Sequence, residues 1–367
     1  MTTETLNSYA PDYSVAPGET LQEALDERGM SQAELARRAN RPLKTINEIV
    51  KGKASITPET SIQFERVLGI PATFWNKREL DYRATLARAE ERRRLEPETG
   101  WLDKFPVKEM VKHGLIGRTN DPVDTLSSVL TFFAVSTTTG WDRQWATSPQ
   151  ALFRQSAAFT ASAGAVAVWL RWGEIEAQKR SCDSYDERKF REGLAGIRAM
   201  TAEPPAVFEP VMKRQCAAGG VAVVFVPELT KTHVSGATRW ISSGRAVIQL
   251  SNRYKTDDHL WFSFFHEAAH ILLHGKRGFF LEGDATPQTE QEEQANRWAS
   301  DFLVPPTVLD RLKEVPHHSA ALIRRTAKEL DIAPGILVGR LQHEHILPWK
   351  TPLNQLKVHF ILRTDQN

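Results

Sequence analysis

Two histidines four residues apart, with a glutamate directly after the first, are the residues of this chain most clearly suited to chemistry. They are His266, Glu267 and His270, in the sequence His-Glu-Ala-Ala-His. On a helix the two histidines lie one turn apart on the same face, where both imidazoles could bind one Zn²⁺ ion. Glu267 then lies beside the metal as a general base. This spacing predicts the attack of a metal-activated water on an amide.

The segment that carries this motif is expected to be a buried helix. No Pro or Gly interrupts it before Gly275, and Asp257 or Asp258 can cap its start. The residues that make it apolar nearly all round are Phe262, Phe264, Phe265, Ile271, Leu272 and Leu273. A glutamate and two histidines in such a helix each need a partner to offset desolvation, and a metal ion satisfies both imidazoles at once. The alternative is a buried helix with satisfied histidines and a stray carboxylate.

A hydrolytic zinc site needs a third protein ligand and an open fourth position. His274 continues the spacing, but it lies eight residues from His266. That separation is roughly 12 Å along a straight helix at about 1.5 Å per residue. Metal bonds of about 2 Å cannot span it. We therefore interpret His274 as a structural residue or as one that supports a ligand.

The third ligand is expected in residues 289–303. This segment predicts a helix that ends at Pro305 and Pro306. Glu292 opens its apolar stripe, and Glu293, one residue further round the helix, is the alternative ligand. A different interpretation leaves both glutamates as solvated charges of the first turn. The apolar residues on the same face as Glu292 are Ala295, Ala299, Phe302 and Leu303.

The two segments together resemble the ImmA/IrrE family of metallopeptidases. In that family a Glu-x-x-Ala-Asn-x-Phe-Ala-x-x-Leu-Leu-x-Pro helix follows the His-Glu-x-x-His helix, and this chain has Glu-Glu-Gln-Ala-Asn-Arg-Trp-Ala-Ser-Asp-Phe-Leu-Val-Pro. Trp298 stands where the family usually has Phe, and Val304 stands where Met is common. Both replacements are apolar. The resemblance implies that His266, His270 and Glu292 are the metal ligands and that Glu267 is the catalytic base.

The sequence before the motif helix predicts β-strands at residues 221–227, 235–237 and 246–250. By the resemblance, these strands form a small sheet whose edge groove holds the substrate as an added strand. A donor for the oxyanion could come from Arg253 or Tyr254.

Residues 18–69 predict a compact set of short helices. Ser31 and Glu34 form a capping box at the start of one helix. Asn40 tolerates the left-handed conformation that a tight turn needs, and Pro42 suits the first turn of the next helix. This pattern is typical of a helix-turn-helix module, whose second helix enters the DNA major groove. The apolar residues expected to face inward are Leu35, Ala36, Ala39, Ile46, Ile49, Val50, Ile62, Val67 and Leu68.

This module resembles the Xre-type helix-turn-helix family and, within it, the HigA-like antitoxins. The matching pieces are Ser-Gln-x-Glu-Leu-Ala, Thr-Ile-x-Glu-Ile, Lys-Gly-Lys, Ile-Thr-Pro-Glu-Thr and Phe-Trp. Asn40 stands where the family usually has Gly, and Pro42 stands where it usually has Ser. The change to Pro42 removes a hydroxyl and an N–H that could contact a phosphate. The resemblance implies double-stranded operator DNA as a partner. A homodimer is the expected default for reading paired half-sites.

The distribution of charged residues supports a DNA-facing side in only one segment of the module. Residues 37–53 hold six Lys or Arg against Glu48 alone, whereas residues 1–60 hold seven against nine Asp or Glu. Leu43, Lys44 and Asn47 lie early in the second helix, where side chains reach base edges. The residues expected to contact DNA are Gln32, Arg41, Leu43, Lys44, Asn47 and Lys51. The alternative is a helical protein-interaction module with a solvated basic edge.

The expected fold class is α+β. Residues 1–76 form an all-α helix-turn-helix DNA-binding domain, residues 77–97 a charged helical linker, and residues 98–215 a helical adaptor or sensor region. Residues 216–367 form a zincin-like, ImmA/IrrE-like metallopeptidase domain with a small β-sheet, closed by a last helix and a short strand. Large apolar groups of the helical region come from Trp101, Trp141, Trp145, Trp169 and Trp172.

The composition excludes several classes of protein. With 367 residues and a net charge of +2, the chain has room for two or three domains and is neither a polycation nor a polyanion. Cys182 and Cys216 lack the spacing of a metal site or a disulfide framework. The first residues show no secretory signal, and the most apolar stretch, residues 157–170, is too short to cross a bilayer. We expect a cytoplasmic protein that does not contact a membrane.

These features predict a DNA-binding transcriptional regulator fused to a zinc-dependent endopeptidase, whose activity could be latent or depend on a stimulus. The resemblance implies a regulatory protein as substrate, either a partner repressor, a toxin or the chain itself. The alternative function is an antitoxin-like regulator whose metal site is structural or inactive.

Overall fold

The computed structural model describes residues 15–147, 163–230, 232–251, 256–276, 278–283 and 289–360. They belong to two compact units, Met1–Thr99 and Gly100–Asn367. The described chain is mostly helical with one small mixed sheet, which confirms the α+β class. No helix within the described ranges is both long and apolar enough to cross a membrane.

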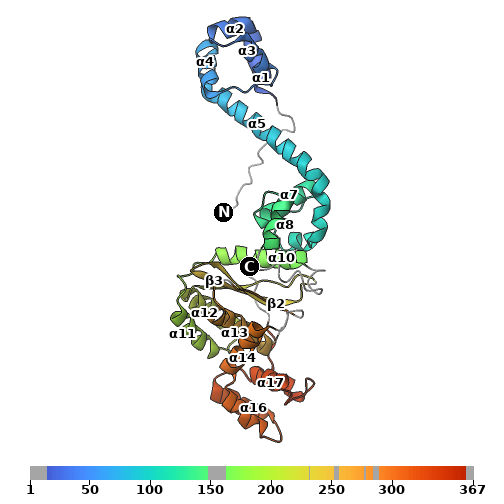
Figure 1. Ribbon diagram of the computed structural model, residues 1–367, viewed down its shortest axis with the longest axis vertical. Helices are drawn as coiled ribbons and strands as arrows, with labels where there is room; N and C mark the ends of the chain where they lie inside the picture. The colour runs from blue at the N-terminus through green and yellow to red at the C-terminus, as the bar shows by residue number, and fades with distance from the viewer. Residues whose placement is uncertain are drawn as a thin grey trace. The chain divides into compact units, whose positions relative to one another are not determined.

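The first unit is built from short helices followed by a long one (Figure 1). They are α1 (Pro17–Asp26), α2 (Gln32–Arg38), α3 (Leu43–Val50), α4 (Pro58–Leu68) and α5 (Ala72–Leu95). The backbone N–H of Glu34 donates to Ser31 Oγ at 3.1 Å, and that of Thr60 donates to Thr57 Oγ1 at 3.3 Å. Asn40 has a φ of 52° in the turn between α2 and α3. The predicted cap at Ser31 and the predicted left-handed turn are therefore confirmed.

The core of this unit closes around Trp75, whose ring meets that of Phe64 edge-on at 5.7 Å between centroids. The prediction that Ile62 faces inward is wrong, because its side chain is 45% exposed. The buried residues of α4 are instead Thr60, Ser61, Phe64 and Leu68.

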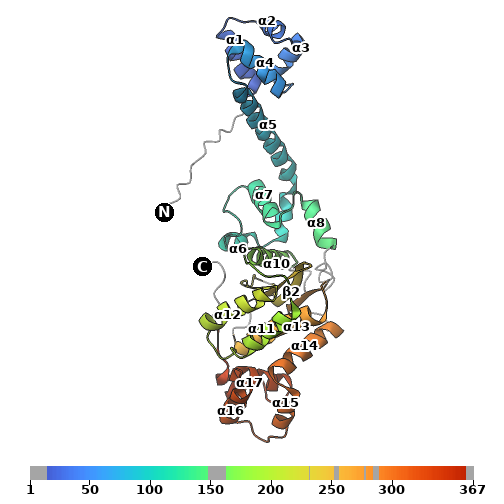
Figure 2. The same cartoon turned by 90° about the vertical axis from the view of Figure 1, so that its left-hand side faces the viewer.

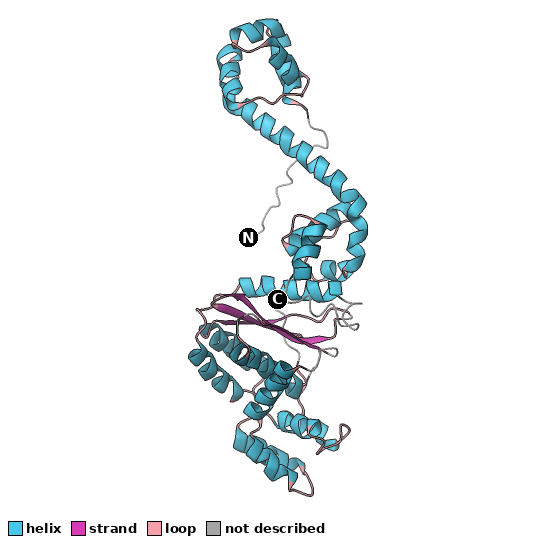
Figure 3. Ribbon diagram, viewed as in Figure 1, coloured by secondary structure: helices cyan, strands magenta, loops and turns pink. Residues whose placement is uncertain are grey.

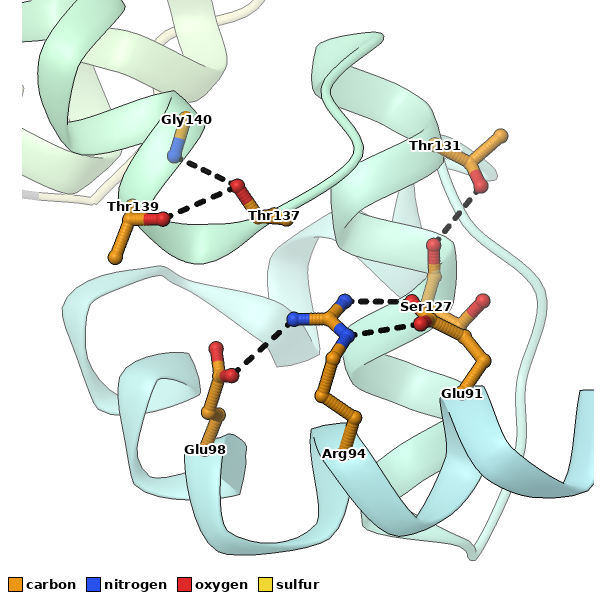
Figure 4. A network of polar contacts seen from close by, with 8 residues as sticks. All are labelled: Glu91, Arg94, Glu98, Ser127, Thr131, Thr137, Thr139 and Gly140. Carbon is orange, nitrogen blue, oxygen red and sulfur yellow. Dashed lines mark hydrogen bonds and ion pairs between the residues drawn. The ribbon is translucent and has the colours of Figure 1, made fainter.

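Helix α5 extends beyond this core. Glu79 is its last buried residue before Leu95, and Glu79 accepts hydrogen bonds from Ile56 N at 3.1 Å and Arg83 Nε at 2.7 Å. Near the end of α5, Arg94 lies between Glu91 and Glu98, with Nη2 at 2.6 Å and Nη1 at 3.3 Å from their carboxylates (Figure 4). Such pairs three or four residues apart stabilise an exposed helix by a few tenths of a kcal/mol each, roughly.

The second unit begins with short helical segments around a cluster of aromatic rings. After η1 (Glu96–Lys104), these segments are α6 (Val107–Lys112), α7 (Pro122–Phe133) and α8 (Thr138–Thr147). The rings of Trp101 and Trp141 meet edge-on at 5.4 Å, and Phe105 and Phe133 pack beside them. The side chain of Trp145, also expected in this core, lies outside the described residues.

A four-stranded sheet forms the centre of the second unit, in the order β1-β3-β2-β4. Its strands are β1 (Val221–Phe225), β2 (Val234–Ser242), β3 (Arg245–Leu250) and β4 (Phe279–Gly283). β1 and β3 are parallel, whereas β2 is antiparallel to both β3 and β4. Helix α10 (Ala163–Gln178) lies on one face, and α11 (Glu187–Arg198), α12 (Pro205–Ala218) and α13 (Asp257–Leu273) lie on the other (Figures 2 and 3).

Two arginines join α10 to the sheet. Arg239 is buried, and its guanidinium donates to Leu170 O at 2.7 Å and to Gln249 Oε1 at 3.2 Å. Burial lowers the pKa of Arg239 to about 10, so it remains charged at neutral pH. Arg245 donates to the carbonyls of Ala177 and Arg180, near the end of α10, where cations satisfy unpaired carbonyls. These bonds fix the helix on the sheet.

The remaining helices pack beyond α13. They are α14 (Glu290–Leu303), α15 (Pro306–Lys313), α16 (Ala320–Leu330), α17 (Pro334–His343) and η3 (Pro352–Leu356). In the described part of the tail, the expected short strand is reduced to an isolated bridge between Thr256 and His359.

Candidate metal centre

His266 and His270 lie on α13, which packs under the sheet and is buried on nearly every side. The helix begins at Asp257, so Asp257 is its first residue and not its cap; the preceding Thr256 makes no side-chain capping bond. Asp257 Oδ1 nevertheless accepts from the free backbone N–H of Asp258 at 2.9 Å. The helix ends at His274 and Gly275, and Gly275 has a φ of 71°.

Glu292, in the first turn of α14, meets both histidines. His266 Nε2 and His270 Nε2 are 2.9 Å apart, and Glu292 Oε2 lies 3.1 Å from the first and 3.5 Å from the second. All three side chains are buried. Thr289 Oγ1 accepts from Glu292 N at 3.2 Å, which fixes the start of α14. Glu293, the alternative ligand, is exposed and lies outside this cluster.

The pKa values of the three groups show where a proton resides when no metal is bound. Burial lowers the pKa of His266, but the hydrogen bond to Glu292 and the nearby carboxylates outweigh it and raise the pKa to about 9. Burial lowers the pKa of His270 to about 4. Burial alone would raise the pKa of Glu292, but the bonds to both histidines lower it to about 2. At neutral pH His266 is therefore protonated against a carboxylate, and His270 is neutral.

Glu267 lies on α13 against strand β2 and is fully buried. Neither of its carboxylate oxygens has a hydrogen-bond partner among the described residues. Burial raises the pKa of Glu267 well above its ordinary value, and Glu282 adds to this effect. A Cβ atom at Gly236 would lie 2.5 Å from Glu267 Oε1, so the glycine leaves the space that this carboxylate occupies.

Two residues support His270 from behind. His270 Nδ1 lies 2.9 Å from His274 Nδ1, and His274 Nε2 lies 3.2 Å from Gln294 Oε1. Phe280 of β4 stacks on the His270 ring, with centroids 3.8 Å apart and an interplanar angle of 13°. His274 thus contacts His270 and does not join the cluster, and contacts of this kind fix the orientation of a ligating imidazole.

The donor set fits a metal ion. Two imidazole nitrogens and one carboxylate oxygen lie within 4.8 Å of one another, which matches the two-histidine, one-glutamate sets of catalytic zinc sites. A buried His266–Glu292 pair with a proton between them is the arrangement that a divalent ion would replace.

Strand β4 contributes two residues to the site that the sequence analysis missed. Phe280 covers His270, and the charge of Glu282 acts on both His266 and Glu267. The run Phe-Phe-Leu-Glu-Gly is apolar only at its start, and a five-residue edge strand gives little periodic signal. Arg253 and Tyr254, the predicted oxyanion donors, lie outside the described residues.

A cavity of about 280 Å³ lies beside the metal cluster. Ser235 and Glu282 line it at the sheet, and Phe262, whose ring lies 6.0 Å from that of His266, lines it along α13. Gly339 of α17 and Trp349, which is 59% exposed, line its other side. The cavity borders the metal cluster through Phe262 and Glu282, and none of His266, Glu267, His270 and Glu292 lines it.

The residues expected to contact DNA gather at α2 and α3 of the first unit. Lys44 is largely exposed and lies 3.9 Å from Glu48, and Leu43 is also exposed. Asn47 donates to Leu43 O at 3.1 Å. Within the domain, Gln32 bonds Gln22 at 2.6 Å, Arg41 bonds Gln63 at 2.7 Å, and Lys51 is exposed.

Comparisons with known proteins assign both units to domain families. Residues 219–341 match the IrrE N-terminal-like domain, and residues 21–75 match a helix-turn-helix domain. These matches confirm the two resemblances seen in the sequence. The chain is a helix-turn-helix regulator domain fused to an IrrE N-terminal-like peptidase-family domain.

Three similar proteins each cover less than a quarter of this chain. An uncharacterized HTH-type transcriptional regulator of Escherichia coli K12, YddM, is 37% identical over 59 residues, which are 16% of this chain and 63% of that relative. Antitoxin HigA of Pseudomonas aeruginosa, solved with the higBA promoter, is 31% identical and covers 23% of this chain and 95% of its own, with a TM-score of 0.22. A HigA-family addiction module antidote protein of Coxiella burnetii is 27% identical, with coverages of 23% and 94% and a TM-score of 0.21.

Proposed function

We propose that this chain is a DNA-binding regulator whose second unit is a zinc-dependent endopeptidase acting on a regulatory protein. The observation that carries this proposal is the buried convergence of His266, His270 and Glu292, with the unpartnered carboxyl of Glu267 beside them. The match of residues 219–341 to a peptidase-family domain supports the same chemistry.

In this proposal His266, His270 and Glu292 hold one Zn²⁺ ion. When bound, the ion would acidify a water molecule and polarise the carbonyl of the substrate. The proton on His266 must leave before its Nε2 can ligate. His274 and Phe280 keep the His270 ring in its orientation.

Glu267 acts as the general base and acid. Its carboxylate takes the proton from the attacking water and returns it to the leaving amine. Burial raises the pKa of Glu267 well above its ordinary value, which makes the carboxylate a stronger base towards the water. Gly236 positions it by leaving room beside β2.

The edge of the sheet provides a place for the substrate backbone. β4 pairs with β2 on one side and is the last strand of the sheet. An extended peptide can add to such an edge through main-chain hydrogen bonds. The substrate would be a partner repressor, a toxin or the chain itself.

The first unit would direct this activity by binding double-stranded operator DNA through α3, with Lys44 and Asn47 towards the bases and Lys51 towards phosphates. A homodimer would match paired half-sites, and both activities would operate in the cytoplasm. The match of residues 21–75 to a helix-turn-helix domain supports this part of the proposal.

A second candidate function is an antitoxin-like regulator whose metal site is structural or inactive. The burial of all four site residues favours this alternative, because a catalytic zinc site needs an open position for water. The match of residues 219–341 to a peptidase-family domain favours the peptidase.

One experiment separates the two candidates. It compares the protein fragments in cells that express wild type with those in cells that express Glu267→Gln. Zinc content is measured first on both purified proteins and is expected to be equal. The peptidase predicts fragments that appear only with wild type. The structural alternative predicts identical fragment sets and an unchanged regulatory phenotype.

A further inference from the structure

The cavity between α13, α14, α17 and β4 is lined by charged groups that the protein itself leaves without partners. Glu282 Oε2, Asp258 Oδ1 and two guanidinium nitrogens of Arg340, Nε and Nη1, are buried and have no hydrogen-bond partner within the described chain. All three side chains line the cavity. Gly339, the neighbour of Arg340, brings α17 close to Asp258, because a Cβ atom there would lie 2.6 Å from Asp258 Oδ2. Among the described residues, no ion pair joins Arg340 to either carboxylate.

The ion pairs within the chain satisfy only part of each group. Asp258, which is 8% exposed, accepts from Lys357 Nζ through Oδ2 at 2.6 Å, and this leaves Oδ1. Arg340 Nη2 lies 3.0 Å from Glu344 and 3.5 Å from Asp301, which leaves Nε and Nη1. A buried donor or acceptor without a partner destabilises the fold, and a charged one does so more strongly. A molecule that pairs with these atoms inside the cavity is therefore expected.

The presence of both signs of charge indicates what kind of molecule fits. A simple anion would pair with Arg340 but would also face two carboxylates, and a simple cation would face the guanidinium. A zwitterion can offer a carboxylate to Arg340 and an ammonium to Asp258 and Glu282, with charge-assisted hydrogen bonds at both ends. Because each charge of the ligand then meets an opposite one, the loss of its hydration is compensated.

The cavity has room for a free amino acid. It measures about 280 Å³, whereas a cavity of about 150 Å³ can hold a benzene ring. Its remaining wall includes the polar Ser235 at the sheet and the apolar Val304 and Ile336 from the helices. An amino acid with an aliphatic carbon skeleton, such as leucine, is therefore a suitable probe.

We propose that this cavity binds a free α-amino acid, with its carboxylate on Arg340 and its ammonium on Asp258 and Glu282. Neither the proposed cleavage nor the proposed DNA binding requires this site, so the inference goes beyond the proposed function. The competing occupant is water, which would pair with the same atoms.

The test is the calorimetric titration of L-leucine, N-acetyl-leucine and leucinamide into the purified full-length chain. Leucine carries both charges, whereas N-acetyl-leucine lacks the ammonium and leucinamide lacks the carboxylate. We expect leucine to bind at a single site and each analogue to bind at least about tenfold more weakly, because it loses a charge-assisted hydrogen bond. The titrations are made once with a chelator and once with zinc. Leucine should bind in both, because no proposed metal ligand lines the cavity.

Substitutions assign the two ends of the ligand. Glu282→Gln should weaken the binding of leucine but not that of N-acetyl-leucine, which has no ammonium to lose its partner. Arg340→Gln should weaken the binding of leucine but not that of leucinamide. Glu314→Gln and Arg324→Gln, at exposed positions, are the matched controls and should bind leucine as wild type does. Thermal melting checks that each variant is folded, and the comparison of the three ligands needs no variant.

Four results would contradict the inference. No saturable binding of leucine, or equal binding of the three compounds, would assign the unpartnered atoms to water. Binding that requires zinc would place the ligand on the metal. A preference for leucyl-leucine, in which the two charges lie further apart, would exclude a free amino acid as the ligand. A lack of Glu267-dependent cleavage bears on the proposed function alone, because none of these titrations measures cleavage.

Discussion

Glu267 owes its position to the missing side chain at Gly236. The carboxyl group occupies the space where a Cβ atom of residue 236 would lie, on the strand that covers α13. An unpartnered, fully buried carboxyl can hold this position only if the wall around it fits closely. The proposed catalytic base therefore depends on a residue of β2 that has no functional group.

Gly236→Ala should displace this carboxyl. We expect cleavage to fall by about 10- to 100-fold, because small displacements of a catalytic group are costly. Zinc content should stay at the wild-type level, because the three ligands do not contact residue 236. Gly244→Ala, whose added Cβ meets nothing within 4 Å, is the control and should leave the rate unchanged. Equal activity of the two variants would contradict the positioning role.

His266 holds a proton that zinc must displace. Its pKa is raised to about 9, so below that pH the ligand nitrogen is protonated. Zinc affinity should rise about tenfold per pH unit from pH 6 to 8, with roughly one proton released per ion bound at pH 7. Calorimetry in two buffers of different ionisation enthalpy measures the release. Binding without proton release at pH 7 would show that His266 is already neutral.

The residues of the candidate metal centre on α13 and α14 could be predicted from the sequence because their spacing is local. His266, Glu267 and His270 follow from one helical turn, and Glu292 follows from the stripe of its own helix. Gly236 and Glu282 could not be found in this way, because they reach the site across the strand pairing of β2 and β4. That pairing joins residues more than forty positions apart, roughly, and long-range pairing leaves no periodic signal.

At the scale of elements, the start of α13 is tied to the tail of the chain. Asp257 N donates to Val358 O at 2.8 Å, and Asp257 Oδ1 accepts from Val358 N at 3.1 Å. Gly335 of α17 packs on the same carboxyl, where a Cβ atom would lie 2.3 Å from Oδ1. The helix that carries His266 and His270 is thus held at its first residue by two later segments.

This contact makes stability depend on pH. Burial raises the pKa of Asp257 to about 7 from an ordinary value of 3.8. The neutral carboxyl is favoured in the folded state, so its contribution is fully present below about pH 4 and is lost as pH rises through about 7. Relative to Asp257→Asn, the wild-type free energy of unfolding should fall by up to about 4 kcal/mol between pH 4 and 8.

Denaturant unfolding of both proteins at pH 4, 6 and 8 measures this difference. A chelator is present throughout, which removes the separate pH dependence of zinc binding. Parallel curves for the two proteins would mean that Asp257 is ionised in the folded state across this range.

The prediction that failed in the first unit also belongs to this scale. Ile62 was expected inward from its place among apolar residues, but α4 packs with Phe64 and Leu68 towards the core and leaves Ile62 exposed. The predicted cap at Ser31 and the turn at Asn40 were found because single residues determine them. Rotation of a helix depends on its packing partners, which the local sequence does not specify.

At the scale of the whole molecule, one chain joins a helix-turn-helix domain to an IrrE N-terminal-like domain. Each has its own core, so a change in one site should leave the other intact. If the proposed function is right, Glu267→Gln abolishes cleavage and leaves DNA binding unchanged.

DNA binding should depend on α3. For the full-length chain on the DNA upstream of its own gene, Asn47→Ala should weaken binding by about 1–3 kcal/mol, and Lys44→Ala should reduce the salt dependence by about one unit. Arg66→Ala, at an exposed position of α4, is the control. Fluorescence anisotropy at several salt concentrations measures both. Wild-type affinity in the Lys44 and Asn47 variants would favour the protein-interaction interpretation of this unit.

The neighbouring glutamates of α14 allow the most direct test of the metal centre. Glu292 is buried against both histidines, and Glu293 is exposed one residue away. Zinc is titrated onto purified wild type, Glu292→Gln and Glu293→Gln in competition with a chelator of known affinity. We predict one tightly bound ion for wild type and for Glu293→Gln, and affinity weakened at least about tenfold in Glu292→Gln. Equal zinc affinity in all three proteins, or a loss confined to Glu293→Gln, would contradict the account.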